Sequence, residues 1–224
     1  FVTVAALLLA ATLAALRWLP REQRDTGPAP APPSFLALLC RPDLLRTYLA
    51  AFGSCFVFAS AFNYLPFYLA GPPFSATTGL ITSLYFSYLI GVVIGPLAGK
   101  ISNRIGNGAA MALGSLVFAL AITISLVASM VAVVLSLAGV CAGFFTVHAS
   151  AAGSLNRKLT GSRGRANSLY VLFYYLGGFA GITASGYAYR FAGWQGVVSL
   201  GVLMLSVPFG AGVGEMRQSR RAAP

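Results

Sequence analysis

Long apolar runs, each separated from the next by a short polar or glycine-rich break, make up most of the chain. Seven of these runs approach or exceed the roughly 20 residues that a helix needs to cross a bilayer. They lie at about 1–19, 44–70, 77–99, 107–127, 130–153, 165–189 and 194–213. Because lipid cannot satisfy open backbone groups, and the pattern does not alternate as barrel strands do, the runs predict transmembrane α-helices.

The breaks between the runs carry turn chemistry. Glycine, proline, asparagine and serine gather in "AGPPFSATTG" at 70–79, in "NRIGNG" at 103–108 and around "RFAGWQG" at 190–196. The break near 128–130 holds only small residues, so its position is the least sharply marked. The predicted order is one span, a polar stretch, and six spans joined by short loops.

The polar stretch after the first run divides the chain. Residues 20–35, "PREQRDTGPAPAPPSF", are charged and then rich in Pro and Ala, as in a semi-rigid linker. The next segment, "LALLCRPDLLRTY" at 36–48, predicts a short amphipathic helix on the membrane surface. We expect four parts: a transmembrane helix at 1–19, a cytoplasmic linker at 20–43, a six-helix transmembrane domain at 44–214 and a basic cytoplasmic tail at 215–224.

The first run does not have the features of a signal peptide. It has no basic stretch before it, and it ends at Arg17, Trp18 and Pro20 instead of a small-residue cleavage site. An odd number of spans, with an apolar run already under way at Phe1, predicts a chain that lacks its N-terminal part.

Composition narrows the class and removes several functions. Hydrophobic residues make up 58% of the chain and charged residues 8%, whereas soluble domains carry roughly 25% charged residues. The formal net charge of +11 would suit nucleic acid in a soluble chain, but here the basic residues lie in the breaks, so we exclude nucleic-acid binding. Cys40, Cys55 and Cys141 form no CxxC pair and predict neither a metal site nor a disulfide framework.

The basic residues also predict which side of the membrane each break faces. When the runs are threaded through a bilayer in order, only Arg190 of the 15 Lys and Arg residues falls on one side. By the positive-inside rule, the side that holds the others is cytoplasmic. The C-terminus and the segments around Lys100 and Lys158 then lie inside, and residue 1 lies outside.

The segment "GPLAGKISNRIGNG" at 95–108 joins two runs on this cytoplasmic side. It is similar to motif A of the major facilitator superfamily (MFS), in which glycines flank an Asp-Arg pair in the loop between helices eight and nine. The positions that match the motif are Gly95, Gly99, Arg104 and Gly106. Asn103 stands where the family usually has Asp, so the resemblance implies a gate without its acidic contact.

The whole chain resembles the C-terminal part of an MFS transporter: the last helix of the first half, the linker between halves, and helices seven to twelve. The implied fold is an all-α integral membrane protein, with an MFS-type six-helix bundle, one preceding helix and a missing N-terminal half. Residues 169–198 resemble the penultimate-helix region of bacterial drug and sugar efflux members. The resemblance implies alternating-access transport of a small molecule in a bacterial inner membrane, with export of drugs or sugars by proton antiport as the narrower expectation.

Small residues recur every four positions in two of the runs. They are Gly91, Gly95 and Gly99 in the third run and Gly177, Gly181 and Ser185 in the sixth. Such faces let helix backbones approach closely. In the resembled family these two helices face the other half, so the spacing implies a moving interface. Ordinary packing within this half is the alternative.

Polar and aromatic residues near the middle of the runs are candidates for a substrate pocket. The amide of Asn63 must find a partner or water at membrane depth. The other candidates in this group are the tyrosine pairs Tyr85 with Tyr88 and Tyr174 with Tyr175. For each of them, packing between helices is the alternative.

The one histidine of the sequence, His148, lies in the fifth run, on the cytoplasmic side of its middle. Imidazole changes charge near neutral pH, so His148 is a candidate proton carrier or substrate contact. The runs contain no Asp or Glu to pair with it, and a neutral histidine bonded across helices is the alternative.

Nothing in the sequence predicts an enzyme or a cofactor site. Metal ligation needs converging His, Cys or carboxylate side chains, and the runs supply one His and no acid. Ser-His catalysis needs an acid that orients the imidazole, and the sequence shows neither such an acid in the runs nor a GxSxG elbow. The glycines at 95–108 are not in phosphate-loop order, and the basic "RKLTGSRGR" at 157–165 predicts an anchor at the membrane surface. A channel or scaffold is the second function class, but the ring of like charges typical of channels is not visible.

Overall fold

The computed structural model describes residues 2–18, 33–159 and 163–222. The chain forms two compact units, residues 1–32 and residues 33–224. The described part of the first unit is one helix, α1 (Val2–Trp18), whose apolar side chains are largely exposed. α1 coincides with the helix predicted at 1–19, whereas the predicted linker falls outside the described residues as far as residue 32.

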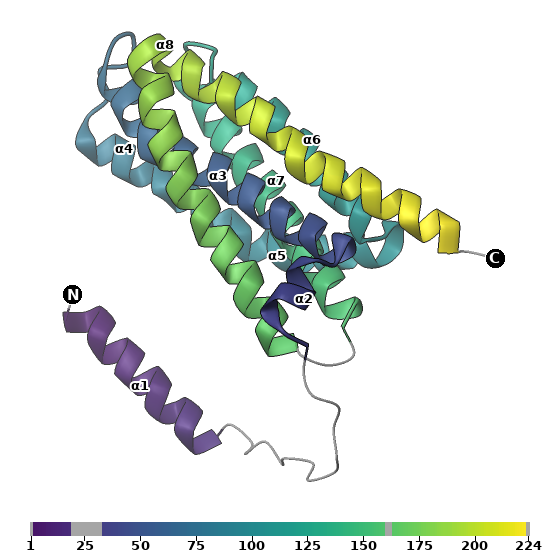
Figure 1. Ribbon diagram of the computed structural model, residues 1–224. Coiled ribbons are helices and arrows are strands. Elements are labelled where there is room, and N and C mark those ends of the chain that lie inside the picture. The colour runs from purple at the N-terminus through teal and green to yellow at the C-terminus, as the bar shows by residue number, and fades with distance from the viewer. Residues whose placement is uncertain (1, 19–32, 160–162, 223–224) are drawn as a thin grey trace. The chain divides into compact units, whose positions relative to one another are not determined.

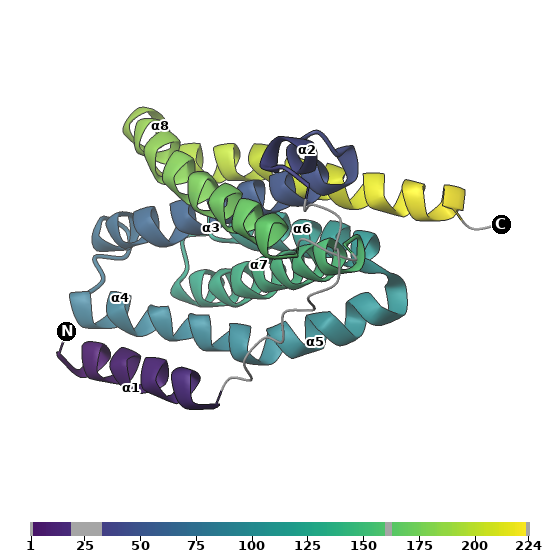
Figure 2. The ribbon, with the colours of Figure 1, turned by 60° about the horizontal axis from the view of Figure 1, so that its bottom comes forward.

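The second unit is a bundle of helices, and no strand occurs among the described residues (Figure 1 and Figure 2). Its elements are α2 (Phe35–Leu39), α3 (Pro42–Ala70), α4 (Thr78–Leu84), the 3-10 helix η1 (Tyr85–Leu89), α5 (Ile90–Ile105), α6 (Asn107–Ile124), α7 (Met130–Arg157) and α8 (Arg163–Ala222). In the part of the chain that the structure describes, 5 helical segments are long and apolar enough to cross a membrane: α3, α4 to α5 together, α6, α7 and α8. The all-α membrane fold predicted from the apolar runs is confirmed.

α8 contains both the sixth and the seventh predicted run, because a bend replaces the loop between them. The backbone leaves the helical region at Ala192 (φ −139°, ψ 21°) and Gly193 (φ 57°, ψ −145°). Figure 1 shows α8 as two arms that meet at this bend, the second of which runs beside α6. The positive φ of Gly193 favours glycine, so the segment at 190–196 needs one residue of special conformation to reverse the chain.

The prediction of one short helix over residues 36–48 is wrong. α2 covers only Phe35–Leu39, and from Pro42 onward the segment belongs to α3. Proline explains the division, because the residue before a proline disfavours the helical conformation while proline itself suits the first helical position. Ser34 fixes the start of α2, since its hydroxyl accepts a hydrogen bond from the backbone N–H of Ala37.

Two other helices extend further than predicted. α5 continues past residue 99 to Ile105, and the positive φ of Gly106 (89°) then turns the chain into α6. α8 continues past residue 213 to Ala222, because "EMRQSRRA" at 215–222 is built mainly of good helix formers and contains no Gly or Pro. Most of the predicted basic tail is therefore helical.

Glycines bring the helices of the bundle into close contact. A Cβ added to Gly177 or Gly181 of α8 would lie 2.2 Å from a carbonyl oxygen of α3, that of Phe52 or Phe56 respectively. Comparable contacts join α6 to α8 at Gly108 and Gly212, and α6 to α7 at Gly114 and Gly143. At such separations no side chain fits, so glycine sets how closely these helices pack.

This packing overturns part of the predicted interface between halves. Gly177, Gly181 and Ser185 are buried inside this bundle, the first two against the backbone of α3, so they are not free to face a second half. Gly91 of α5 lies against α7, where its added Cβ would be 2.2 Å from the ring of Phe145. For these four residues the alternative, packing within this half, accounts for the spacing.

We expect Gly181→Ala to destabilise the bundle by about 1–3 kcal/mol, the usual range for overpacking, because the new methyl group would overlap the α3 backbone at Phe56. The matched control is Gly210→Ala in the same helix, where a Cβ meets nothing within 4 Å and alanine is the better helix former. The measurement is the thermal unfolding midpoint of each purified variant in detergent. Equal midpoints for the two variants would contradict the close contact of α3 with α8.

Candidate functional site

Five of the six predicted pocket residues belong to one continuous set of rings from α3, η1, α7 and α8, which we call the aromatic wall. Its members are Phe58, Phe62, Tyr85, Tyr88, Phe144, His148, Tyr170, Tyr174 and Tyr175. The predicted candidates among them are Tyr85, Tyr88, His148, Tyr174 and Tyr175. The structure thus brings together tyrosines that lie far apart in the sequence.

The wall is continuous because its rings contact one another across helices. At its centre, Phe58 of α3 stacks on Phe144 of α7, with ring centroids 3.9 Å apart. Toward η1, the ring of Tyr88 lies 5.3 Å from that of Phe58. Toward α8, the ring of His148 lies 6.0 Å from that of Phe144 and 5.4 Å from that of Tyr174. Two buried phenylalanines, Phe58 and Phe144, therefore connect the exposed tyrosines of η1 with His148 and with the tyrosines of α8.

Helix periodicity decides which rings meet. Residues four apart share a helix face, as do Phe58 with Phe62, Phe144 with His148, and Tyr170 with Tyr174. In η1 the 3-10 geometry puts residues three apart over one another. The rings of Tyr85 and Tyr88 are accordingly parallel within 3°, with centroids 6.2 Å apart. A continuous α-helix would offset these two rings around the helix axis.

His148 is held by a tyrosine at the buried back of the wall. The hydroxyl of Tyr170, a side chain only 5% exposed, lies 3.0 Å from Nδ1 of His148. When this hydroxyl donates to Nδ1 of the neutral ring, the ring carries its proton on Nε2. Among the residues that the structure describes, no carboxylate bonds to His148 and no group of three His, Cys, Asp or Glu could hold a metal ion.

Three rings of the wall are exposed, and we call them its front. Tyr85 and Tyr88 are 41% and 38% exposed, and Tyr175 is 69% exposed. The Tyr85 hydroxyl donates to the backbone oxygen of Phe62, which fixes this ring on α3. The pocket between Phe62 and Tyr85 has a volume of only about 10 Å³, room for about one water molecule. A ligand of this wall would therefore lie on the exposed faces of its tyrosines.

Asn63 is not part of the wall. Its side chain is exposed, and its Nδ2 donates to the backbone oxygen of Ala59, one turn earlier in α3, at 2.8 Å. Successive residues of a helix point about 100° apart, so Asn63 faces a different direction from its neighbour Phe62. The partner that the amide needs at membrane depth is thus the helix's own backbone.

The motif-A-like segment ends in a hydrogen bond to α7. The Nη2 of Arg157 donates to Oδ1 of Asn103 at 2.8 Å and to Oδ1 of Asn107 at 3.3 Å. Gly95 and Gly99 have no atom within 4 Å of an added Cβ, so this face of α5 is uncovered within the bundle. The structure also leaves Arg104 exposed and places Gly106 at the turn into α6.

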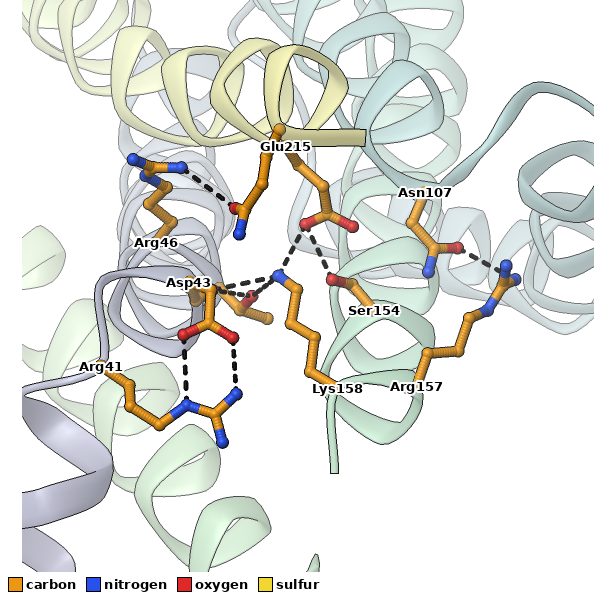
Figure 3. Close-up of polar contacts among 10 residues, drawn as sticks. Arg41, Asp43, Arg46, Asn107, Ser154, Arg157, Lys158 and Glu215 are labelled. Carbon is orange, nitrogen blue, oxygen red and sulfur yellow. Dashed lines mark hydrogen bonds and ion pairs between the residues drawn. The ribbon is translucent and has the colours of Figure 1, made fainter. Parts of the chain in front are cut away.

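Lys158 and Glu215 form a polar contact that the sequence analysis missed (Figure 3). Their Nζ and Oε2 atoms are 2.9 Å apart, and the two side chains are only 18% and 14% exposed. Ser154 donates to the same Oε2 at 2.7 Å, and Lys158 also donates to the backbone oxygen of Asp43 and to the hydroxyl of Thr47. The contact ties the beginning of α3, the end of α7 and the last turns of α8 together.

The prediction of a membrane-surface anchor is therefore wrong for Lys158. The signal that could have revealed its role is Glu215, the one acid of the chain after Asp43. An acid at the end of an apolar helix needs a basic partner, since an unpaired buried charge costs several kcal/mol. Glu215 lies in the predicted tail at 215–224, where a solvated carboxylate would need no partner.

Comparison with known proteins agrees with this fold. The family model described as the Major Facilitator Superfamily matches residues 74–213, more than half of the chain. The "Uncharacterized MFS-type transporter YybF" of Bacillus subtilis (strain 168) is 28% identical over 146 residues, which is 65% of this chain. The match covers 36% of that relative, so the chain spans about a third of its length. This chain, a multi-pass helical membrane protein, belongs to the Major Facilitator Superfamily, a family of transporters and not of enzymes.

Proposed function

We propose that this chain forms one side of a secondary transporter that moves a small molecule across a membrane by alternating access. The observation that carries the proposal is the aromatic wall. Its buried back fixes the rings through contacts between helices, and its front leaves Tyr85, Tyr88 and Tyr175 exposed. Rings that are packed on one side and exposed on the other suit a binding surface better than a fully buried core does.

The chemistry of the wall suggests the class of substrate. Aromatic faces bind other rings and the apolar faces of sugars, and they attract cations through their π electrons. The tyrosine hydroxyls and His148 add polar groups, and the described part of the wall carries no carboxylate. We propose that the substrate is a neutral or weakly cationic amphiphile, either a drug or a sugar. It would be exported from a bacterial cell across the inner membrane in exchange for protons.

A second half would complete the site. None of the most apolar stretch of α4 to α5 is buried inside the bundle (0%), and Gly95 and Gly99 face open space. We propose that an N-terminal half covers these surfaces and that α1 belongs to it. The motif-A-like residues Gly95, Gly99, Asn103, Arg104 and Gly106 would form the cytoplasmic gate, with Arg157 in contact with Asn103.

Counterflow tests whether the protein is a carrier. In proteoliposomes of the complete two-half protein, we expect uptake of labelled ethidium or glucose to saturate and to accelerate when the same unlabelled probe is inside. Tyr175→Ala should raise the KM about 2- to 10-fold, the effect of one aromatic contact. The control is Tyr187→Ala, equally exposed on α8 but outside the wall. An electrical conductance without acceleration from the opposite side would contradict the carrier and indicate a channel.

The pH dependence of transport tests His148. Because imidazole can change charge near neutral pH, we expect the transport rate of the unaltered protein to depend on pH and His148→Gln to flatten that profile. Tyr170→Phe removes the hydrogen bond to Nδ1 but keeps the ring, so it should shift the profile and leave the rate at its optimum within about twofold. A His148→Gln variant with an unchanged rate and an unchanged profile would rule out the proton-carrying role.

A further inference from the structure

A pocket of about 510 Å³ lies where the beginning of α3 meets the end of α8. Its lining residues are Pro42, Asp43, Arg46, Gly214, Arg217, Gln218 and Arg221. The pocket is separate from the aromatic wall and shares none of its residues. Neither the proposed transport cycle nor the motif-A-like gate uses it.

Three arginines converge on this pocket from two helices. Arg217 and Arg221 are four residues apart in α8 and therefore share a helix face, where two like charges repel each other. Arg46 comes from α3 and lies against Gly214, because its Nε and Nη1 are 3.5 Å from the position of an added Cβ there. The glycine thus leaves space for a third guanidinium beside the other two.

The acids near the pocket already have other partners. Asp43 lines the pocket, but its carboxylate binds Arg41 through two hydrogen bonds of 2.7 and 3.2 Å. Glu215 follows Gly214 directly, yet its carboxylate is bonded to Lys158 and Ser154 in the contact that Figure 3 shows. Neither acid therefore neutralises the arginines of the pocket.

The three arginines have few hydrogen-bond partners among the described residues. Arg46 donates to Oε1 of Gln218 at 3.4 Å, a long hydrogen bond to a neutral group. Within the described ranges 2–18, 33–159 and 163–222, Arg217 and Arg221 take part in no hydrogen bond or ion pair. All three are exposed, so they are free to bind an anion from outside the bundle.

The depth of the pocket in the membrane favours a phosphate. The apolar run of α3 begins at residue 44 and that of α8 ends at residue 213, so the pocket residues flank the ends of two spans. This is the level of the lipid headgroups, on the side that the basic residues mark as cytoplasmic. Guanidinium groups bind phosphate oxygens in pairs, and basic pockets between transmembrane helices suit anionic headgroups.

We propose that the pocket formed by Arg46, Arg217 and Arg221 binds an anionic phosphate group, carried by a phospholipid headgroup or free in solution. An anion held between the three guanidinium groups would relieve their repulsion and join the end of α8 to the beginning of α3. The site is independent of the transported substrate.

Native mass spectrometry of the chain tests the proposal, with phosphatidylglycerol, phosphatidylcholine and inorganic phosphate as separate probes. We expect phosphatidylglycerol to bind more tightly than phosphatidylcholine, and Arg217→Gln and Arg221→Gln each to weaken that binding about fivefold. The matched control is Arg220→Gln, which removes the same charge from the same turn but lies outside this pocket, and it should change binding less than twofold. Arg217→Lys keeps the charge and should bind more tightly than Arg217→Gln, which separates loss of the site from misfolding.

The probes distinguish the two sources of phosphate. Binding of phosphatidylglycerol that the pocket variants weaken, with no binding of inorganic phosphate, supports a lipid headgroup. Binding of inorganic phosphate that the same variants weaken supports a site for free phosphate. Equal affinity for the two lipids without phosphate binding, or equal losses in Arg220→Gln and Arg221→Gln, would overturn the proposal.

Discussion

Where α8 crosses α3, Gly177 and Gly181 leave no side chain between the two backbones, and the α8 side of the aromatic wall depends on this contact. Because the first arm of α8 lies this close, Tyr174 reaches the ring of His148 on α7. Tyr170, one turn earlier, reaches Nδ1 of the same histidine. A larger residue at either glycine would move the whole arm and with it the α8 side of the aromatic wall.

At the beginning of α3, the end of α7 and the last turns of α8, the same three helices are held by charge instead of by close packing. Lys158 at the end of α7 contacts Glu215 of α8 and the beginning of α3 at Asp43 and Thr47. A largely buried ammonium group is stable only when several acceptors surround it. For Lys158 the acceptors come from α3 and α8. Glycine contacts at mid-bundle and this ion pair at the end together hold α3, α7 and α8 as one body.

The length of the apolar runs was enough to predict most of the helices, but not the bend that joins the sixth and seventh runs within α8. The type and depth of residues predicted five rings that the structure places in one aromatic wall. Periodicity says which face of a helix is special but not which neighbour covers that face. For this reason the spacing of Gly177 and Gly181 predicted an interface between halves, although α3 covers both glycines. The pairing of Lys158 with Glu215 joins residues far apart in the chain: the sequence shows that Glu215 needs a basic partner, but not which residue supplies it.

If the aromatic wall binds a substrate, its exposed tyrosines face water in the membrane-embedded protein. Cysteine accessibility tests it most directly, in a background in which Cys40, Cys55 and Cys141 are replaced by alanine. Tyr175→Cys and, as the reference, Leu203→Cys occupy positions of α8 that are 69% and 70% exposed, the second of them away from the wall. We predict that a charged, membrane-impermeant thiol reagent modifies the cysteine at position 175 and not the one at 203. If neither cysteine reacts while a lipid-soluble maleimide labels both, the wall faces lipid and the account is contradicted.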